Sequence, residues 1–381
     1  MYRKAEELDV LHRNVPYDFG RLTIPAIDTF PLDRWRRLVA ARWRATSSED
    51  LVWFPPAGDL GLRRAISGHV RLTRGIECDA SQVIITTGSD SAIDILTRTI
   101  LEPGDRVGIE DPARLAALHV FKAAEVELIP IPVDQDGVVV ECLGDIRGNP
   151  PSIVHVTPTH QHPTGATLSL RRRLALLSWA ATERVVIIED DFDSEFGYES
   201  VDLDALHALD RSGVVAYVGT FAKVLHPAIE IGYMIVPPAL VSAVIARYYT
   251  TARQVERVEQ AALAIFMRQG EFARHLRRLR RVHRARRDAL VNALKQAFGD
   301  GVVIGPARSG LTVHVRWPEY PVTTKLLERA RSAGVTLASV RPMCIQRPET
   351  DPGVVMGFAS LSEQHIHDGV ETLARVLQQP R

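Results

Sequence analysis

One lysine stands out in the run GTFAKVLHP at residues 219–227. The chain has only five lysines among its 46 basic residues, and the other basic side chains are arginines. Lys223 lies in a short polar gap between two apolar runs, 214–218 and 231–236, which have the pattern of buried strands. A surface charge could equally be arginine, whereas an amine that attacks a carbonyl must be lysine, because guanidinium does not lose its proton in proteins. Lys223 is therefore a candidate nucleophile.

Polar residues gather at the ends of several short apolar runs. The runs are 83–86, 106–109, 126–133, 153–157, 185–189, 214–219 and 232–236, with helical patterns such as 89–101 and 170–183 between them. This alternation predicts an α/β fold with a mostly parallel, seven-stranded sheet that is covered by helices on both faces. Ligands of such sheets bind at the carboxyl ends of the strands. The residues that follow these ends are TTGSDS, EDP, TPTHQHPTG, EDDF and GTFAK.

The pattern changes near residue 256. A long basic helix is expected at 272–297, and it is followed by short apolar runs and a terminal helix at 363–377. This order is typical of a smaller α+β domain. The expected division is an N-terminal arm and entry helix at 1–50 that joins the small domain, a large domain at 51–255 and a small domain at 256–381.

Seven motifs occur in a recognisable order. They are PAGDLGLRRAI (56–66), VIITTGSDSAIDIL (83–96), LEPGDRVGIEDP (101–112), TPTHQHPTGATLSLRRRLALL (157–177), IIEDDFDSEF (187–196), GTFAKVLHP (219–227) and GFASLSEQHI (357–366). The set resembles the fold type I pyridoxal 5'-phosphate (PLP) enzymes, the aspartate aminotransferase superfamily. It is most similar to the aminotransferase-like domain of MocR-type regulators. Because the resemblance already begins at Phe30, we expect no DNA-binding domain in this chain.

The resemblance assigns roles to several residues. Lys223 would form a Schiff base with the cofactor and move the α-proton of an amino acid or amine substrate. Asp190 would pair with the pyridine nitrogen, and Thr220 would add a hydroxyl near the phosphate. Backbone N–H groups at Gly88, Ser89 and Asp90, at a helix start, would hold the phosphate. Taken singly, Asp190 could instead cap a helix, and residues 88–90 could form a plain strand–helix turn.

Three positions depart from the family pattern around the phosphate. Where the family has an arginine seven residues after the lysine, this chain has Glu230. A position that carries a hydroxyl in the family is Ala222, and a position that carries a tyrosine is Trp53. A carboxylate about 4 Å from a phosphate costs on the order of 1–4 kcal/mol when partly solvated. Weakened or lost PLP binding is therefore an alternative.

Further departures surround the expected ring position. Arg114 takes the place of a stacking aromatic residue, Phe192 that of a tyrosine, and His162 that of an asparagine. Arg114 could still stack on a ring or reach an anion, and His162 could donate to a phosphate. We assign Trp53, Glu230 and Arg341 as candidate substrate contacts, with Arg347 as a second arginine near Arg341.

Composition narrows the function classes. Lysine plus arginine equals aspartate plus glutamate at 46 each, so no overall field favours nucleic acid or a membrane. The basic run at 274–290 has an apolar stripe, which favours a solvated helix face over a nucleic-acid site. The three cysteines are widely spaced and no histidine pattern indicates a metal site. These features predict a cytoplasmic protein without a metal.

The sequence thus predicts a homodimeric PLP-dependent enzyme. Transamination is the default reaction, and the altered positions allow a repurposed biosynthetic outcome, namely elimination, decarboxylation, cyclisation or oxidation. Two alternatives stay open, a ligand-binding or scaffolding protein on the same fold and an enzyme that uses the pocket without PLP.

Overall fold

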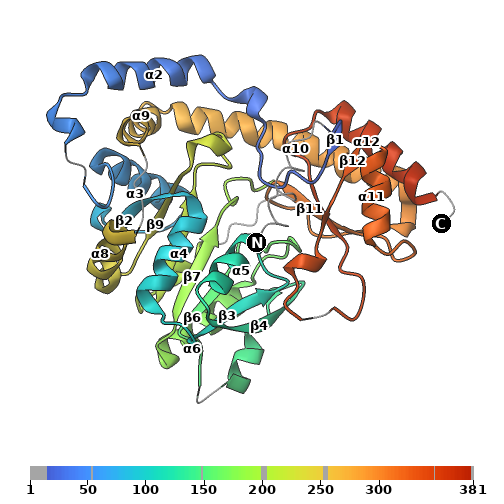
Figure 1. Cartoon of the computed structure of the whole chain (residues 1–381), viewed down its shortest axis with the longest axis horizontal. Coiled ribbons are helices and arrows are strands. Elements are labelled where there is room, and N and C mark those ends of the chain that lie inside the picture. The colour runs from blue at the N-terminus through green and yellow to red at the C-terminus, as the bar shows by residue number, and fades with distance from the viewer. Residues whose placement is uncertain are drawn as a thin grey trace.

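The structure is a computed structural model that describes residues 15–52, 55–146, 149–198, 204–251, 256–346 and 348–378. Figure 1 shows a large sheet flanked by helices, a second and smaller sheet, and the long helix α10 (Glu271–Phe298) running along the top of the molecule. Helix α2 (Leu32–Ala45) lies beside α9 (Arg257–Arg268) at the same upper side.

The large sheet has eight strands in the order β2-β9-β8-β7-β6-β3-β4-β5. The pairs among β8, β7, β6, β3 and β4 are parallel, whereas β9 is antiparallel to both of its neighbours. The strands are β2 (Val83–Thr87), β3 (Arg106–Asp111), β4 (Glu127–Asp134), β5 (Gly137–Val138), β6 (Ile153–Val156), β7 (Val186–Asp191), β8 (Val215–Thr220) and β9 (Ile231–Ile235). This confirms the α/β fold class. One strand more than the predicted seven is present, because the two-residue β5 turns back on the edge strand β4.

Apolar side chains on both faces explain why these strands have continuous apolar runs. Ile188 packs into a cluster with α4, α5 and α8, whereas the preceding Ile187 packs on the opposite face with α6. Alternate residues of a strand point to opposite faces, so a strand covered on both sides must be apolar throughout. The covering helices are α3 (Leu60–Arg74), α4 (Gly88–Ile100), α5 (Leu115–Ala123), α6 (Leu170–Glu183), α7 (Leu206–Leu209) and α8 (Val241–Thr251).

The C-terminal part contains a four-stranded sheet in the order β10-β11-β14-β13, with antiparallel pairs. Its elements are β10 (Val303–Ile304), β11 (Thr312–Arg316), α11 (Thr324–Ser332), β12 (Val335–Thr336), β13 (Ala338–Ser339), β14 (Val354–Gly357) and α12 (Glu363–Gln378). The N-terminal β1 (Tyr17–Asp18) pairs in parallel with β12, so the first described residues pack on this C-terminal part. The domain boundaries stay a prediction.

Helix α10 buries an apolar stripe that includes Leu276, Leu279 and Leu290. Arginines on its other faces contact acidic groups of the same chain: Arg280 lies 2.9 Å from Glu195, and Arg286 lies 2.8 Å from Asp28. These pairs give part of the basic run a role within the fold.

Candidate active site

Loops at the carboxyl ends of the parallel strands carry the candidate residues. Lys223 follows β8 by three residues, and Asp190 is the next-to-last residue of β7. Arg114 follows β3 and begins α5, since its backbone is extended just before the first helical residue. Because β3, β6, β7 and β8 run parallel, these loops meet at one edge of the sheet.

Lys223 is half-buried between β8 and β9. Burial, followed by the positive charge of Arg114, lowers the pKa of its amine to about 7. A substantial fraction of this amine is therefore uncharged at neutral pH, which is the state that attacks a carbonyl carbon.

Asp190 is completely buried, and only one of its two carboxylate oxygens contacts other side chains. Its Oδ2 lies 3.3 Å from Nε2 of His155 and 3.2 Å from Nη1 of Arg114. Its Oδ1 has no hydrogen-bond partner among the described residues. Burial opposes ionisation, but Arg114 and His155 outweigh it and lower the pKa of the Asp190 carboxyl. Asp190 therefore stays ionised with one oxygen available to a ligand N–H.

Arg114 connects two ends of the site. Its Nη2 lies 2.5 Å from Oδ1 of Asp90 and 3.3 Å from Oγ of Ser89, while Nη1 contacts Asp190. The guanidinium carbon lies 5.6 Å from the ring centre of Phe192. Arg114 is nearly buried, whereas its closer acidic partner Asp90 is half-exposed.

The start of α4 is a tight strand–helix turn. Gly88 has a φ of +80°, and a Cβ on Gly232 would lie only 2.4 Å from the Gly88 carbonyl carbon, so both positions require glycine. Thr87 pairs with Ile231 across β2 and β9. The preceding residue, Glu230, is exposed with a φ of +47° beside this turn. An acidic side chain thus stands near the helix N-terminus, where an anion would bind.

His162 is buried and packs edge-on against Phe192, with ring centres 5.7 Å apart. Burial, together with Arg114, lowers the pKa of His162 to about 3, so its imidazole is neutral at physiological pH. Its Nδ1 has no partner among the described residues. Thr220 ends β8, and its hydroxyl accepts a hydrogen bond from the backbone N–H of Ala222 at 3.2 Å.

Arg341 and Trp53 are the remaining predicted substrate contacts. Arg341 is exposed in the short helix η9 (Arg341–Met343) and lies 3.8 Å from Asp351. Trp53 and Arg347 lie outside the described residues.

Sequence reasoning missed His155, which is buried in β6 and contacts Asp190. A single histidine within the apolar run IVHV was the available signal. A second missed group lies under the loop after β6: the buried Glu110 accepts hydrogen bonds from Thr157 at 2.6 Å and from Gln161 at 3.1 Å. These contacts hold the loop that carries His162.

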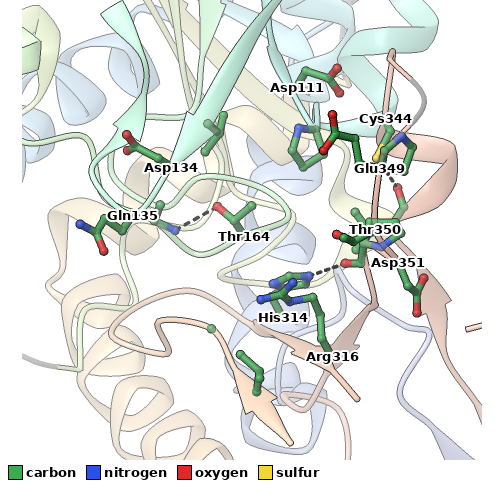
Figure 2. Close-up of a pocket in the computed structure, with 18 of the residues that line it drawn as sticks. Asp111, Asp134, Gln135, Thr164, His314, Arg316, Cys344, Glu349, Thr350 and Asp351 are labelled. Atoms are coloured by element: carbon green, nitrogen blue, oxygen red, sulfur yellow. Dashed lines mark hydrogen bonds between the residues drawn. The ribbon is translucent and has the colours of Figure 1, made fainter. Parts of the chain in front are cut away.

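A cavity of about 580 Å³ adjoins the same loops. Figure 2 shows Asp134, Gln135 and Thr164 on one side of it, and Glu349, Thr350 and Asp351 on the other, with His314 and Arg316 between them. The carboxylate of Asp111 accepts hydrogen bonds from the N–H groups of Ile345 and Gln346 at 2.9 and 3.0 Å. The segment after η9 is thereby attached to the end of β3.

Within the described ranges, no group of three or more histidine, cysteine or acidic residues has the arrangement of a metal site. The helices in these ranges are all too short or too polar to cross a membrane.

Comparisons with known proteins agree with this geometry. The model of the class I and II aminotransferases matches residues 22–347. The chain belongs to the class I and II aminotransferase family.

Several aminotransferase-family relatives are regulators. The chain is 33% identical over 350 residues to the probable rhizopine catabolism regulatory protein MocR of Rhizobium meliloti, covering 92% of this chain and 70% of that protein. It is 27% identical to aromatic-amino-acid aminotransferase 1 of Thermococcus litoralis, covering 93% and 87%. The crystal structure of Pyrococcus horikoshii kynurenine aminotransferase superimposes with a TM-score of 0.88 at 28% identity, covering 99% of this chain and 94% of that chain.

The aminotransferase family implies PLP as a cofactor. The residues that would contact its ring and aldehyde fit that group. The free Oδ1 of Asp190 suits the protonated ring nitrogen, and the amine of Lys223 suits the aldehyde. The N–H groups at the start of α4 suit the phosphate, although Asp90 and Glu230 add negative charge there.

Proposed function

We propose that this protein is a PLP-dependent enzyme that acts on an amino acid or amine through Lys223. The observation that carries the proposal is the buried, unpartnered Oδ1 of Asp190, at the same sheet edge as a lysine whose amine is partly uncharged. Transamination is the simplest reaction, because the family model and the similar solved structures are those of aminotransferases. A repurposed outcome would begin with the same residues.

When bound, PLP supplies an electron sink for bonds broken at the substrate α-carbon. Lys223 would carry the covalent bond to the cofactor and then move the α-proton with its amine. Asp190 would hold the proton on the ring nitrogen, and His155 would keep the Asp190 carboxylate ionised and in place.

We also propose a homodimer. Large apolar side chains are exposed along the N-terminal third and on α8: Val52 is 86% exposed, Tyr249 72% and Trp43 54%. Such surface is costly in a monomer and suits a partner of the same kind. A cytoplasmic location stays a prediction.

A second function is favoured by one contact. Arg114 already pairs with Asp190, the residue expected to bind the ring nitrogen. This contact supports a protein on the aminotransferase fold that has weakened or lost PLP binding, as an enzyme or a ligand-binding protein.

Trapping with borohydride tests the proposal. Incubation with PLP followed by reduction should leave a stable adduct on the peptide that contains Lys223. Lys223→Ala should give no adduct and no turnover, and Lys223→Arg should fail as well, because guanidinium cannot form the covalent bond. Lys295→Ala, on α10, is the matched control and should be labelled normally. A wild-type protein that neither absorbs in the visible with excess PLP nor yields the adduct would favour the second function.

A further inference from the structure

The site has more negative than positive charge where the cofactor phosphate would lie. Asp90 is in the first turn of α4, and Glu230 stands beside the strand pair that leads into it. A phosphate brings further negative charge, so a cation beside the N–H groups of α4 would strengthen PLP binding.

Three other candidate cations are poor choices. Burial lowers the pKa of His162 to about 3, and burial also lowers the pKa of His226. His226 in addition packs against Phe30 and Trp35, with ring centres 5.0 and 6.4 Å away, toward α2. Lys223 is committed to the covalent bond and is only partly charged.

Of the cations compared among the described residues, Arg114 remains, and its geometry suits the role. One end of the guanidinium lies within reach of Ser89 and Asp90 at the helix N-terminus, and the other end lies on the buried Asp190. Its stacking on Phe192 holds it there while Asp90, which is half-exposed, can yield to a stronger anion. Arg114 contacts Oδ2 of Asp190, and Oδ1 of the same carboxylate has no hydrogen-bond partner among the described residues.

We infer that Arg114 is the residue that binds the cofactor phosphate in this chain, exchanging its contact with Asp90 for one with the phosphate. The inference rests on the proposed function. Asp190 keeps Oδ2 on Arg114 and offers Oδ1 to the ring, so one carboxylate serves both groups. Arg114 would then be a cofactor-binding residue that contacts both the phosphate and the carboxylate expected to bind the ring nitrogen.

The test compares PLP with pyridoxal, which has the same aldehyde and ring but no phosphate. Dissociation constants for both are measured by absorbance titration on wild type, Arg114→Ala, Arg114→Lys and the control Arg98→Ala. Arg98 is an exposed arginine on α4 that also pairs with an acidic residue, Asp94, at 2.8 Å. Arg114→Ala should weaken PLP binding by about tenfold to a hundredfold, the range expected for a charge-assisted pair.

In Arg114→Ala the affinity for pyridoxal should fall much less than the affinity for PLP, because the loss of the Arg114 charge acts on Lys223 and Asp190 equally with both compounds. Arg114→Lys should bind PLP with intermediate affinity, since it keeps the charge but not the two-ended reach, and Arg98→Ala should resemble wild type. An unchanged preference for PLP over pyridoxal in Arg114→Ala, or tighter PLP binding, would overturn the inference while leaving the proposed function intact. A wild type that captures neither compound would overturn both. If Arg114→Ala does not fold, the intermediate affinity of Arg114→Lys still decides the matter.

Discussion

At the scale of single residues, the charge state of Lys223 controls when the site can react. Burial, followed by Arg114, brings the pKa of the amine down from 10.5 to about 7. The uncharged amine is the reactive form, so reactivity is gained as pH rises through the pKa and is lost below it.

We expect the rate of adduct formation with PLP to rise with pH and to level off, with a midpoint near pH 7. Stopped-flow absorbance over a pH series measures this midpoint. In Arg114→Ala the midpoint should move to higher pH, because a repelling cation has been removed. A wild-type midpoint above about pH 9 would show that Lys223 behaves as a solvated lysine.

Glu230 is a second single residue that should limit the affinity for the cofactor. Glu230→Arg exchanges a repulsion for an attraction beside the start of α4, and PLP should bind more tightly by about 1–3 kcal/mol, roughly fivefold to 150-fold. Absorbance titration measures the change. Glu102→Arg, an exposed reversal beyond the far end of α4, is the control and should have little effect. Weaker binding in Glu230→Arg would mean that Glu230 has a positive role, such as a contact to a substrate amine.

At the scale of elements, Asp111 joins the end of β3 to the segment that follows η9. Its two carboxylate oxygens accept from Ile345 and Gln346, and the N–H of Ala113 donates to the carbonyl of Met343 at 2.8 Å. Three hydrogen bonds thus hold a C-terminal segment against the loop that carries Arg114.

Asp111→Ala should loosen this attachment. The amides of Ile345 and Gln346 should exchange with solvent about tenfold faster, because each partly exposed, charge-assisted bond contributes on the order of 1 kcal/mol. Asp111→Asn keeps one acceptor and should give a smaller change. Hydrogen exchange read by mass spectrometry on the peptide around Ile345 measures it, with the exposed Asp300→Ala as control. Equal exchange in wild type and Asp111→Ala would show that other contacts hold the segment.

At the scale of the whole molecule, the exposed apolar side chains predict self-association. Light scattering at micromolar concentration should give the mass of two chains. Val52→Asp should shift the protein toward the monomer and weaken PLP binding, if the partner completes the site. Leu174→Asp is the control, since Leu174 is an exposed apolar residue on α6, outside the N-terminal third and α8. A stable wild-type monomer would remove the dimer from the proposal.

Sequence alone determined the elements and the residues that each strand end presents. Buried strands require continuous apolar runs and helices require a 3.6-residue period, so the local sequence predicts both kinds of element. The predicted bounds agree within one or two residues with those of α6 (Leu170–Glu183) and β2 (Val83–Thr87). Lys223 and Asp190 could be singled out because each directly follows or ends such a run.

Tertiary structure decided which side chains meet. Arg114 reaches Asp90 and Asp190, which are 24 and 76 residues away, and His155 meets Asp190 across the β6–β7 pair. Sequence spacing could not supply these contacts. The physical reason is that a local pattern reports the face on which a side chain lies. Its partner depends on strand order and on the packing of helices over the sheet, which bring distant segments together.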